Sequence, residues 1–187
     1  TKSDKAEGFL NITALGRISA QMDVCPETIL TICSFYRNLE SPCLFDCILM
    51  VCLCLELTPK LPFYFEQIDE MTESLSIIPS HLLDSPPSRI MAIHPEKLAA
   101  KTLLASIKTA VVLSSHTEGE SIESLAKRFD CYPMDIGILK QNFDWIAATA
   151  QRVFSHLWSM DWRRENGDEE ENKRPLCSHE KLMQCIV

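Results

Sequence analysis

Residues 121–158 read SIESLAKRFD CYPMDIGILK QNFDWIAATA QRVFSHLW, and this stretch decides the fold. The pattern predicts a short helix capped by Ser121, a turn at Tyr132-Pro133 and one long helix after it. Apolar residues recur along the long helix at alternating steps of four and three, the spacing of a stripe that faces a hydrophobic core. The stripe consists of Leu139, Phe143, Ile146, Ala150, Val153 and Leu157.

A second row lies about a hundred degrees round the same helix. It consists of Ile138, Asn142, Trp145, Thr149, Arg152 and His156. An aromatic ring and a guanidinium group two turns apart on one face are suited to stacking and guiding single-stranded bases. The competing interpretation is that Trp145 packs beneath a neighbouring helix and that Arg152 makes a surface ion pair. Periodicity alone leaves both interpretations open.

The composition fits a globular chain with an acidic balance. Of 187 residues, 46% are hydrophobic, and the net charge is −8. A protein that binds nucleic acid on its own usually has a basic face, because neutralising phosphates supplies most of the affinity. Any contact of this chain with DNA is therefore expected to be weak in isolation.

Cysteine usage indicates a reducing compartment. The chain has nine cysteines, an odd number, and Cys43, Cys47, Cys52 and Cys54 lie in or beside one apolar run, where thiols act as small hydrophobic groups. The polar segment 1–7 is not a signal peptide, and an N-terminal threonine suggests a fragment or a processed chain. We expect an intracellular location, and a nuclear one if the source is eukaryotic.

The rest of the chain is expected to be helical, and the fold class all-α. Thr13 is placed to cap a helix over 14–22, and Pro26 to begin one that ends near Leu39. A buried helix is expected over 44–57, too short for the roughly 20 residues of a membrane span. Residues 59–94 read as a linker, and a helix after Pro95 ends near 117–120. The charged segment 159–187 is expected to be an acidic, mostly disordered tail with one short helix near its end.

Two further features of the chain bear on the prediction. Residues 9–12 have strand character. Residues 121–158 also match the outline of a DNA-binding helix–turn–helix motif. However, the second helix is longer than a typical recognition helix and lacks the basic cluster that contacts the major groove.

No motif of a catalytic site is present. The chain lacks a glycine-rich phosphate loop, a nucleophile elbow and a helical His-Glu-x-x-His sequence. Cys177, His179 and Cys185 are the nearest approach to a metal-ligand cluster, and chance explains them better. We therefore predict no catalytic residue, no metal site and no cofactor on this chain.

Several segments together resemble the C-terminal region of superfamily 2 DNA-repair helicases, the group of the archaeal repair helicases, HELQ and the helicase half of DNA polymerase theta. Residues 12–19 and 26–28 look like the end of that family's winged-helix domain, and residues 44–59 like the first buried helix of its ratchet domain. Residues 107–113, Lys127 to Phe129, Tyr132 to Ile136, Asp144-Trp145 and Arg152 resemble the rest of the ratchet. The similarity covers roughly residues 9–157 in the family's order.

The resemblance implies a winged-helix remnant over 1–40, a helical ratchet-like bundle over 41–158 and the tail over 159–187. It implies that one long helix contacts single-stranded or forked DNA, through residues that match the family's pattern or lie beside them: Trp145, Arg152, Lys140, Asn142 and Thr149. Arginines that the family usually has just upstream are replaced here by Gly137 and Ile138. ATP and magnesium belong to the motor of the parent family, present in cis or in trans, so the chain by itself is not expected to be an ATPase.

The sequence thus predicts the DNA-guiding C-terminal portion of an ATP-dependent DNA helicase, with no membrane association. The alternative is a non-catalytic helical module that binds protein and not nucleic acid. The net charge and the missing upstream arginines favour this alternative.

Overall fold

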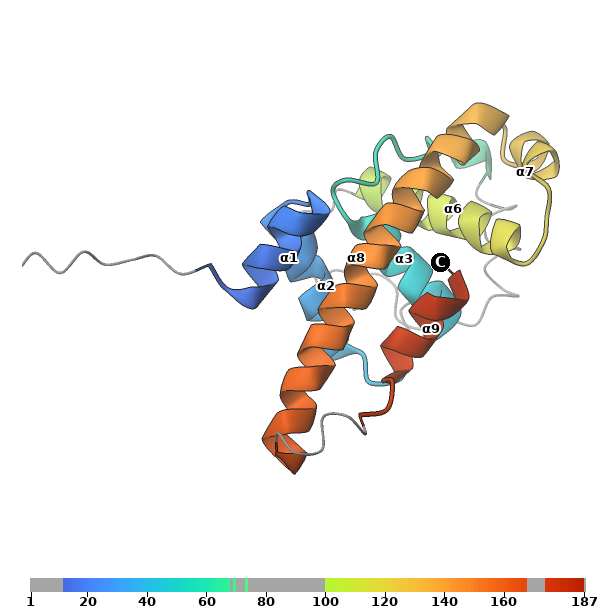
Figure 1. The fold of residues 1–187 in the computed structure, drawn as a ribbon. Helices are drawn as coiled ribbons and strands as arrows, with labels where there is room; N and C mark the ends of the chain where they lie inside the picture. Colours follow the sequence, from blue (N-terminus) through green and yellow to red (C-terminus); the bar gives the residue numbers. More distant parts are fainter. Residues whose placement is uncertain (1–11, 68, 70–72, 74–99, 168–173, 187) are drawn as a thin grey trace, which may run out of the picture.

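The computed structural model describes residues 12–67, 69, 73, 100–167 and 174–186 (Figure 1). Every regular element in this part of the chain is helical, which confirms the all-α fold class. The elements are α1 (Ala14–Met22), α2 (Pro26–Asn38), α3 (Leu44–Leu53), the 3-10 turn η1 (Phe65–Gln67), α6 (Ala100–Thr117), α7 (Ile122–Arg128), α8 (Pro133–Asn166) and α9 (Ser178–Ile186).

The winged-helix remnant stays a prediction, because the described residues contain no strand that would form a wing. Of the segment 9–12 that reads as a strand, only Ile12 is described, and it is in no regular element. Most of the predicted linker and the predicted helix start at Pro95 also lie outside the described residues. One core cluster runs from Val24 to Ile186, so α2 shares its core with the bundle over 41–158.

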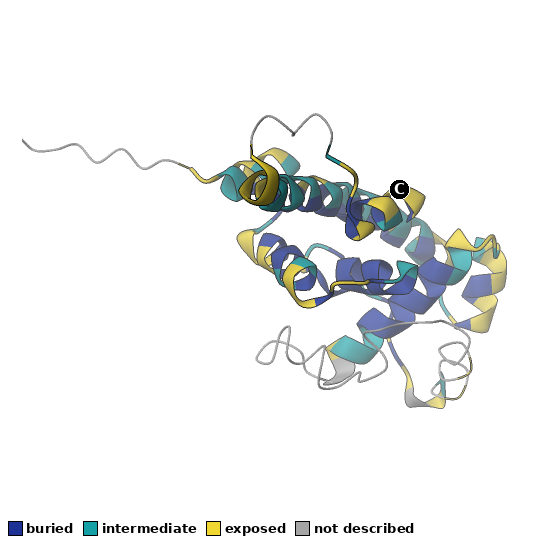
Figure 2. Ribbon diagram, turned by 90° about the horizontal axis from the view of Figure 1, so that it is seen from below, coloured by how far each residue is buried: buried dark blue, intermediate teal, exposed yellow. Residues whose placement is uncertain are grey.

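Helix α8 is the axis of the bundle. It packs against α1, α2, α3, α6, α7 and α9, and it crosses the whole molecule in Figure 1. The predicted apolar stripe is buried along its full length, from Leu139 to Leu157. Figure 2 shows the buried residues on the inner sides of the helices and the exposed ones on the outside. The periodicity of the sequence therefore predicts correctly which face of α8 meets the core.

Helix α3 lies at the centre and is buried on all sides except at its first residue. It packs against α2, α6, α8 and α9, as expected for a helix that is apolar all round. Burial raises the pKa of the thiols of Cys47, Cys52 and Cys54, so these groups stay protonated and pack as hydrophobic side chains. The helix ends at Leu53, four residues before the predicted end at Leu57.

The early end of α3 has a structural reason. The chain turns at Cys54, whose amide donates to the carbonyl of Val51, and Glu56 then points at the start of α2. There the Glu56 carboxylate accepts hydrogen bonds from the Cys25 amide, at 2.5 Å, and from the Thr28 hydroxyl. A carboxylate at a helix N-terminus satisfies amides that have no partner within the helix and lies at the positive end of its dipole. Glu56 thus caps a helix that begins 30 residues earlier in the chain.

Helix α6 holds the loop that follows α3. The buried ammonium group of Lys108 donates to the carbonyl of Pro62 and to the side chain of Gln67, each at 2.7 Å. The Leu61 amide donates to the Thr109 hydroxyl at 3.1 Å. Burial lowers the pKa of Lys108. These polar contacts inside an apolar interface fix the register of the loop on α6.

Of the segment 159–187, expected to be a mostly disordered tail with one short helix, the structure describes residues 159–167 and 174–186. Helix α8 continues eight residues beyond Trp158 to Asn166, and Gly167 ends it with a positive φ of 79°. Helix α9 then returns and packs against both α8 and α3. Its inner face carries His179, Met183 and Ile186, which are buried. Apolar residues recur along 179–186, and a helix forms there although a charged run precedes it. Among the described residues, no helix is both long enough and apolar enough to cross a bilayer.

Replacing Glu56 by alanine is expected to lower the free energy of unfolding by about 1–2 kcal/mol, because the first turn of α2 loses its cap. Chemical denaturation monitored by circular dichroism measures this loss. The matched control is Glu165→Ala, at an exposed position near the end of α8, which is expected to change stability by less than about 0.5 kcal/mol. Equal stabilities for the two variants would show that the Glu56 cap contributes nothing.

Candidate functional site

The row of α8 that the sequence singles out is divided by its neighbours. Helix α1 packs over the part that contains Trp145. The indole nitrogen of Trp145 donates to the carbonyl of Met22 at 2.7 Å, and the half-buried ring packs against the core cluster. Met22 is the last residue of α1, so this bond satisfies a carbonyl that has no partner within its own helix. The structure thus places Trp145 beneath a neighbouring helix, as in the second interpretation of the sequence.

The residues near Trp145 are also engaged within the molecule. Thr149 is 0% exposed, and its hydroxyl donates to the carbonyl of Trp145 at 3.1 Å. Asn142 donates to the carbonyl of Thr58 at 3.2 Å, and Lys140 forms an ion pair with Asp144 at 2.5 Å. Thr149 is therefore inaccessible to a ligand, and the side chains of Asn142 and Lys140 already have partners within the chain. Of the predicted DNA-contacting residues, Arg152 is therefore the one that lies exposed and clear of these contacts.

Arg152 belongs to a basic pocket on the C-terminal half of α8, which we call the arginine pocket. It has a volume of about 450 Å³ and is lined by Arg152, Ser155, His156, Ser159, Met160, Arg163 and Arg174. Positions 152, 156, 159 and 163 follow one another at helical spacing and continue the row beyond the cover of α1. None of the described residues that line the pocket is acidic. Three guanidinium groups and two hydroxyls on one concave surface are the donors that a phosphate group requires.

A network at the start of α9 holds one wall of this pocket. Arg174 contacts Glu180 through both guanidinium nitrogens, at 3.1 and 3.4 Å, and donates to the Ser155 hydroxyl on α8 at 3.1 Å. Glu180 also accepts from the Cys177 amide at 3.0 Å, which caps α9. Burial alone would raise the pKa of Glu180, but the bonds from Cys177 and Arg174 outweigh it, and the pKa is lowered. The ionised carboxylate therefore keeps Arg174 at the edge of the pocket.

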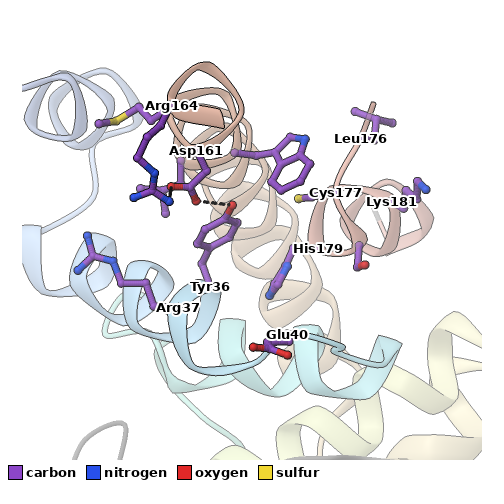
Figure 3. Close-up of a pocket in the computed structure, with 13 residues that line it drawn as sticks. Tyr36, Arg37, Glu40, Asp161, Arg164, Leu176, Cys177, His179 and Lys181 are labelled. Atoms are coloured by element: carbon purple, nitrogen blue, oxygen red, sulfur yellow. Dashed lines mark hydrogen bonds and ion pairs between the residues drawn. The ribbon is translucent and has the colours of Figure 1, made fainter. Parts of the chain in front are cut away.

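A larger cavity adjoins the arginine pocket, and we call it the aromatic cavity. Its volume is about 930 Å³, and it lies between α2, the end of α8 and the start of α9 (Figure 3). Its ring-bearing walls are Tyr36, Trp158 and His179. Met160, which is 57% exposed, lines both this cavity and the arginine pocket. The two hollows are therefore neighbours on either side of one flexible side chain.

The aromatic walls are held in place. The Tyr36 hydroxyl donates to Asp161 at 3.1 Å, as Figure 3 shows, and its ring stacks on Phe154 with centroids 6.0 Å apart. Burial and the neighbouring Asp161 carboxylate raise the pKa of Tyr36, so the phenol stays neutral. The Trp158 indole donates to the carbonyl of Pro175 at 2.7 Å, which fixes its plane relative to the chain before α9.

His179 is a buried polar group in this wall. It is 4% exposed and lies against the rings of Phe35, Tyr36 and Phe154. Burial lowers its pKa to about 4, against the smaller opposite effect of a hydrogen bond with the backbone of Leu39. Its Nε2 atom has no partner within the described residues. The imidazole is therefore neutral near pH 7, with one polar atom unsatisfied.

The described residues contain no group of three or more acidic, histidine or cysteine side chains arranged to hold a metal ion. Cys177, His179 and Cys185 do not form such a group, and Cys185 is exposed on the outer side of α9.

Sequence reasoning missed Arg163, Arg174, Trp158 and Tyr36 as site residues. Arg163 follows Arg152 by eleven positions, which is three helical turns, and the signal was lost because the long helix was expected to end at Trp158. Arg174 and Tyr36 come from other elements, and no spacing within the sequence brings them to α8. A comparison of the chain with models of known protein families found no match, and neither did a comparison with curated proteins.

Replacing Trp145 by phenylalanine is expected to lower the free energy of unfolding by about 1–2 kcal/mol, because the carbonyl of Met22 loses its donor. Chemical denaturation measures this loss. The same variant is expected to bind single-stranded DNA as tightly as the parent chain. A loss of affinity without a loss of stability would contradict the packed position of this ring.

Lowering the pH from 6.5 toward about 5 is expected to destabilise the chain through His179. The folded pKa lies below the unfolded value of 6.5, so the unfolded chain binds the proton first and stability falls as the pH falls. Above 6.5 both states are neutral and the effect is absent. Denaturation at a series of pH values should give a loss of about 1–2 kcal/mol that disappears in His179→Phe but persists in His156→Gln. An identical pH dependence in parent and His179→Phe would contradict this assignment.

Proposed function

We propose that this chain is the DNA-guiding C-terminal portion of an ATP-dependent DNA helicase, and that α8 contacts the single strand through the arginine pocket. The observation that carries the proposal is the pocket itself: Arg152, Arg163 and Arg174 line it with two hydroxyls, and Arg174 is held there by its ion pair with Glu180. The resemblance to the ratchet region of repair helicases directs attention to the same helix. Because the Trp145 indole is bonded to Met22, we propose the contact at the C-terminal half of α8 and not at Trp145.

The charge distribution supports a guiding role and not autonomous binding. The chain carries a net charge of −8, so the basic pocket is a local feature on an acidic molecule. Counterion release from a few phosphates supplies limited affinity, and the acidic surroundings oppose the approach of a polyanion. A motor in cis or in trans that already holds the strand would raise its local concentration at α8. The catalytic groups for ATP hydrolysis, and their magnesium, belong to that motor.

One observation favours the alternative of a protein-interaction module. The aromatic ring that would stack bases in the resemblance is used inside the molecule, as a cap for α1. If the chain binds protein alone, a partner should protect the exposed residues Ile138 and Arg152 of the predicted face, since α1 already packs on Trp145. Protection that leaves this face untouched would exclude the alternative in this form.

Replacing Arg152 by alanine is expected to weaken the binding of a fluorescein-labelled oligothymidylate of about ten nucleotides. Fluorescence anisotropy at several salt concentrations measures the effect. Because each phosphate contact contributes about 0.7 to the slope of log affinity against log salt for single strands, the slope should fall by about that amount. Lys127→Ala on α7 removes the same charge at an exposed position on another element, and it should leave the slope unchanged.

Equal effects of Arg152→Ala and Lys127→Ala would show that binding reflects overall charge and not the arginine pocket. Absence of binding even at low salt, to single-stranded and forked DNA alike, would contradict the proposed function.

A further inference from the structure

The aromatic cavity has a size, a lining and a rim that define the chemistry of an occupant. A volume of about 930 Å³ lies in the range of small-molecule sites, which are lined mostly by apolar and aromatic groups with a few polar ones. Tyr36 and Trp158 are fixed in orientation by the bonds described above, so their rings need little ordering when a flat ligand enters. Rigid rings around a hollow are suited to a planar aromatic group.

The rim is more basic than acidic. Arg37, Arg164 and Lys181 border the cavity and are exposed, and Figure 3 shows Arg37 on α2, Arg164 on α8 and Lys181 on α9. The acidic residues in the lining are Glu40 and Asp161. Asp161 already has two partners, the Tyr36 hydroxyl and Arg164 at 3.2 Å. Because Asp161 and Arg164 pair with each other, Arg37, Lys181 and Glu40 remain, and this small basic excess favours an occupant that carries negative charge beside its aromatic group.

The position of the cavity beside the arginine pocket limits the kinds of ligand that fit. Met160 is the shared wall, so a ligand that passes over this side chain reaches both hollows. A nucleotide has the required parts: a phosphate for the guanidinium groups and a planar base for the rings.

We propose that the aromatic cavity receives an unstacked base of single-stranded DNA whose backbone phosphate lies in the arginine pocket. This inference rests on the proposed function and adds the place where the strand is gripped. Trp158 and Tyr36 take the stacking role that the resemblance assigns to Trp145. Because every base has a flat face, such a site tolerates any sequence, as a guiding element must.

The test compares a ten-nucleotide oligothymidylate with an abasic strand of the same length and charge, by anisotropy and by quenching of tryptophan emission. The parent chain is expected to bind the oligothymidylate about 5-fold or more tightly than the abasic strand, because a stacked base contributes that much or more. Trp158→Leu should remove this difference and the quenching. Trp145→Phe should retain both.

Trp158→Leu can disturb the fold, because the indole that it removes also donates to the carbonyl of Pro175. A second variant therefore tests the cavity without touching this bond. Lys181 lies exposed on the rim, so Lys181→Glu is expected to keep the fold, as circular dichroism will show, and to weaken the binding of oligothymidylate. Lys127→Glu, away from the cavity on α7, is the control for the change of charge and should have the smaller effect.

The outcomes separate the two proposals. If both strands bind equally and Arg152→Ala weakens both, the phosphate contact stands and the base site is overturned. If neither strand binds, both proposals are overturned. If thymidine monophosphate alone binds as tightly as the oligomer and with the same dependence on Trp158, the cavity is a free-nucleotide site and the strand assignment is overturned.

Discussion

The burial of one continuous stripe on α8 is the constraint on which the rest of the structure depends. Leu139, Phe143, Ile146, Ala150, Val153 and Leu157 fix the rotation of the helix about its axis. Every other polar contact along α8 follows from that rotation. The row that begins at Ile138 meets α1 at Trp145 and is exposed at Arg152. A helix of 34 residues is about 50 Å long, longer than the core it crosses, so its last turns extend from the bundle.

These last turns are stabilised by the returning chain. Arg174 joins Glu180 on α9 to Ser155 on α8, and Trp158 holds the backbone at Pro175. The segment that closes the bundle therefore also completes the walls of both hollows. Residues that stabilise the fold and residues proposed to bind the strand therefore lie in the same region. A substitution that breaks the Arg174–Glu180 contact is therefore expected to disturb the arginine pocket even when no residue of α8 is changed.

Much of the fold was predictable because its signals are local. Thr13, Pro26, Ser121 and Pro133 each begin a helix at the predicted residue, since a cap or a fixed φ acts within one turn. The cap of α2 by Glu56 was not predictable, because it joins positions about thirty residues apart. The reason for Gly16 is likewise visible only in three dimensions. In the structure a Cβ atom there would lie 3.0 Å from the Ile12 side chain, so glycine allows the close approach of the chain before α1.

The candidate site was predictable only in part, because several of its residues come from segments that are distant in the sequence. Spacing placed Trp145 and Arg152 on one row, but it could not show that α1 covers the first and spares the second. The partners of Arg152 come from beyond the expected helix end and from another segment, Arg174. The short helix expected near the end of the chain is α9, but the sequence did not show that it packs through His179, Met183 and Ile186.

The most direct test of the account is photo-cross-linking of a single strand that carries 5-iodouridine, followed by mass-spectrometric mapping of the modified peptides. The account predicts cross-links to Tyr36 and to residues 152–164, which line the aromatic cavity and the arginine pocket. Cross-links confined to residues 132–145, or spread over the surface without preference, would contradict it.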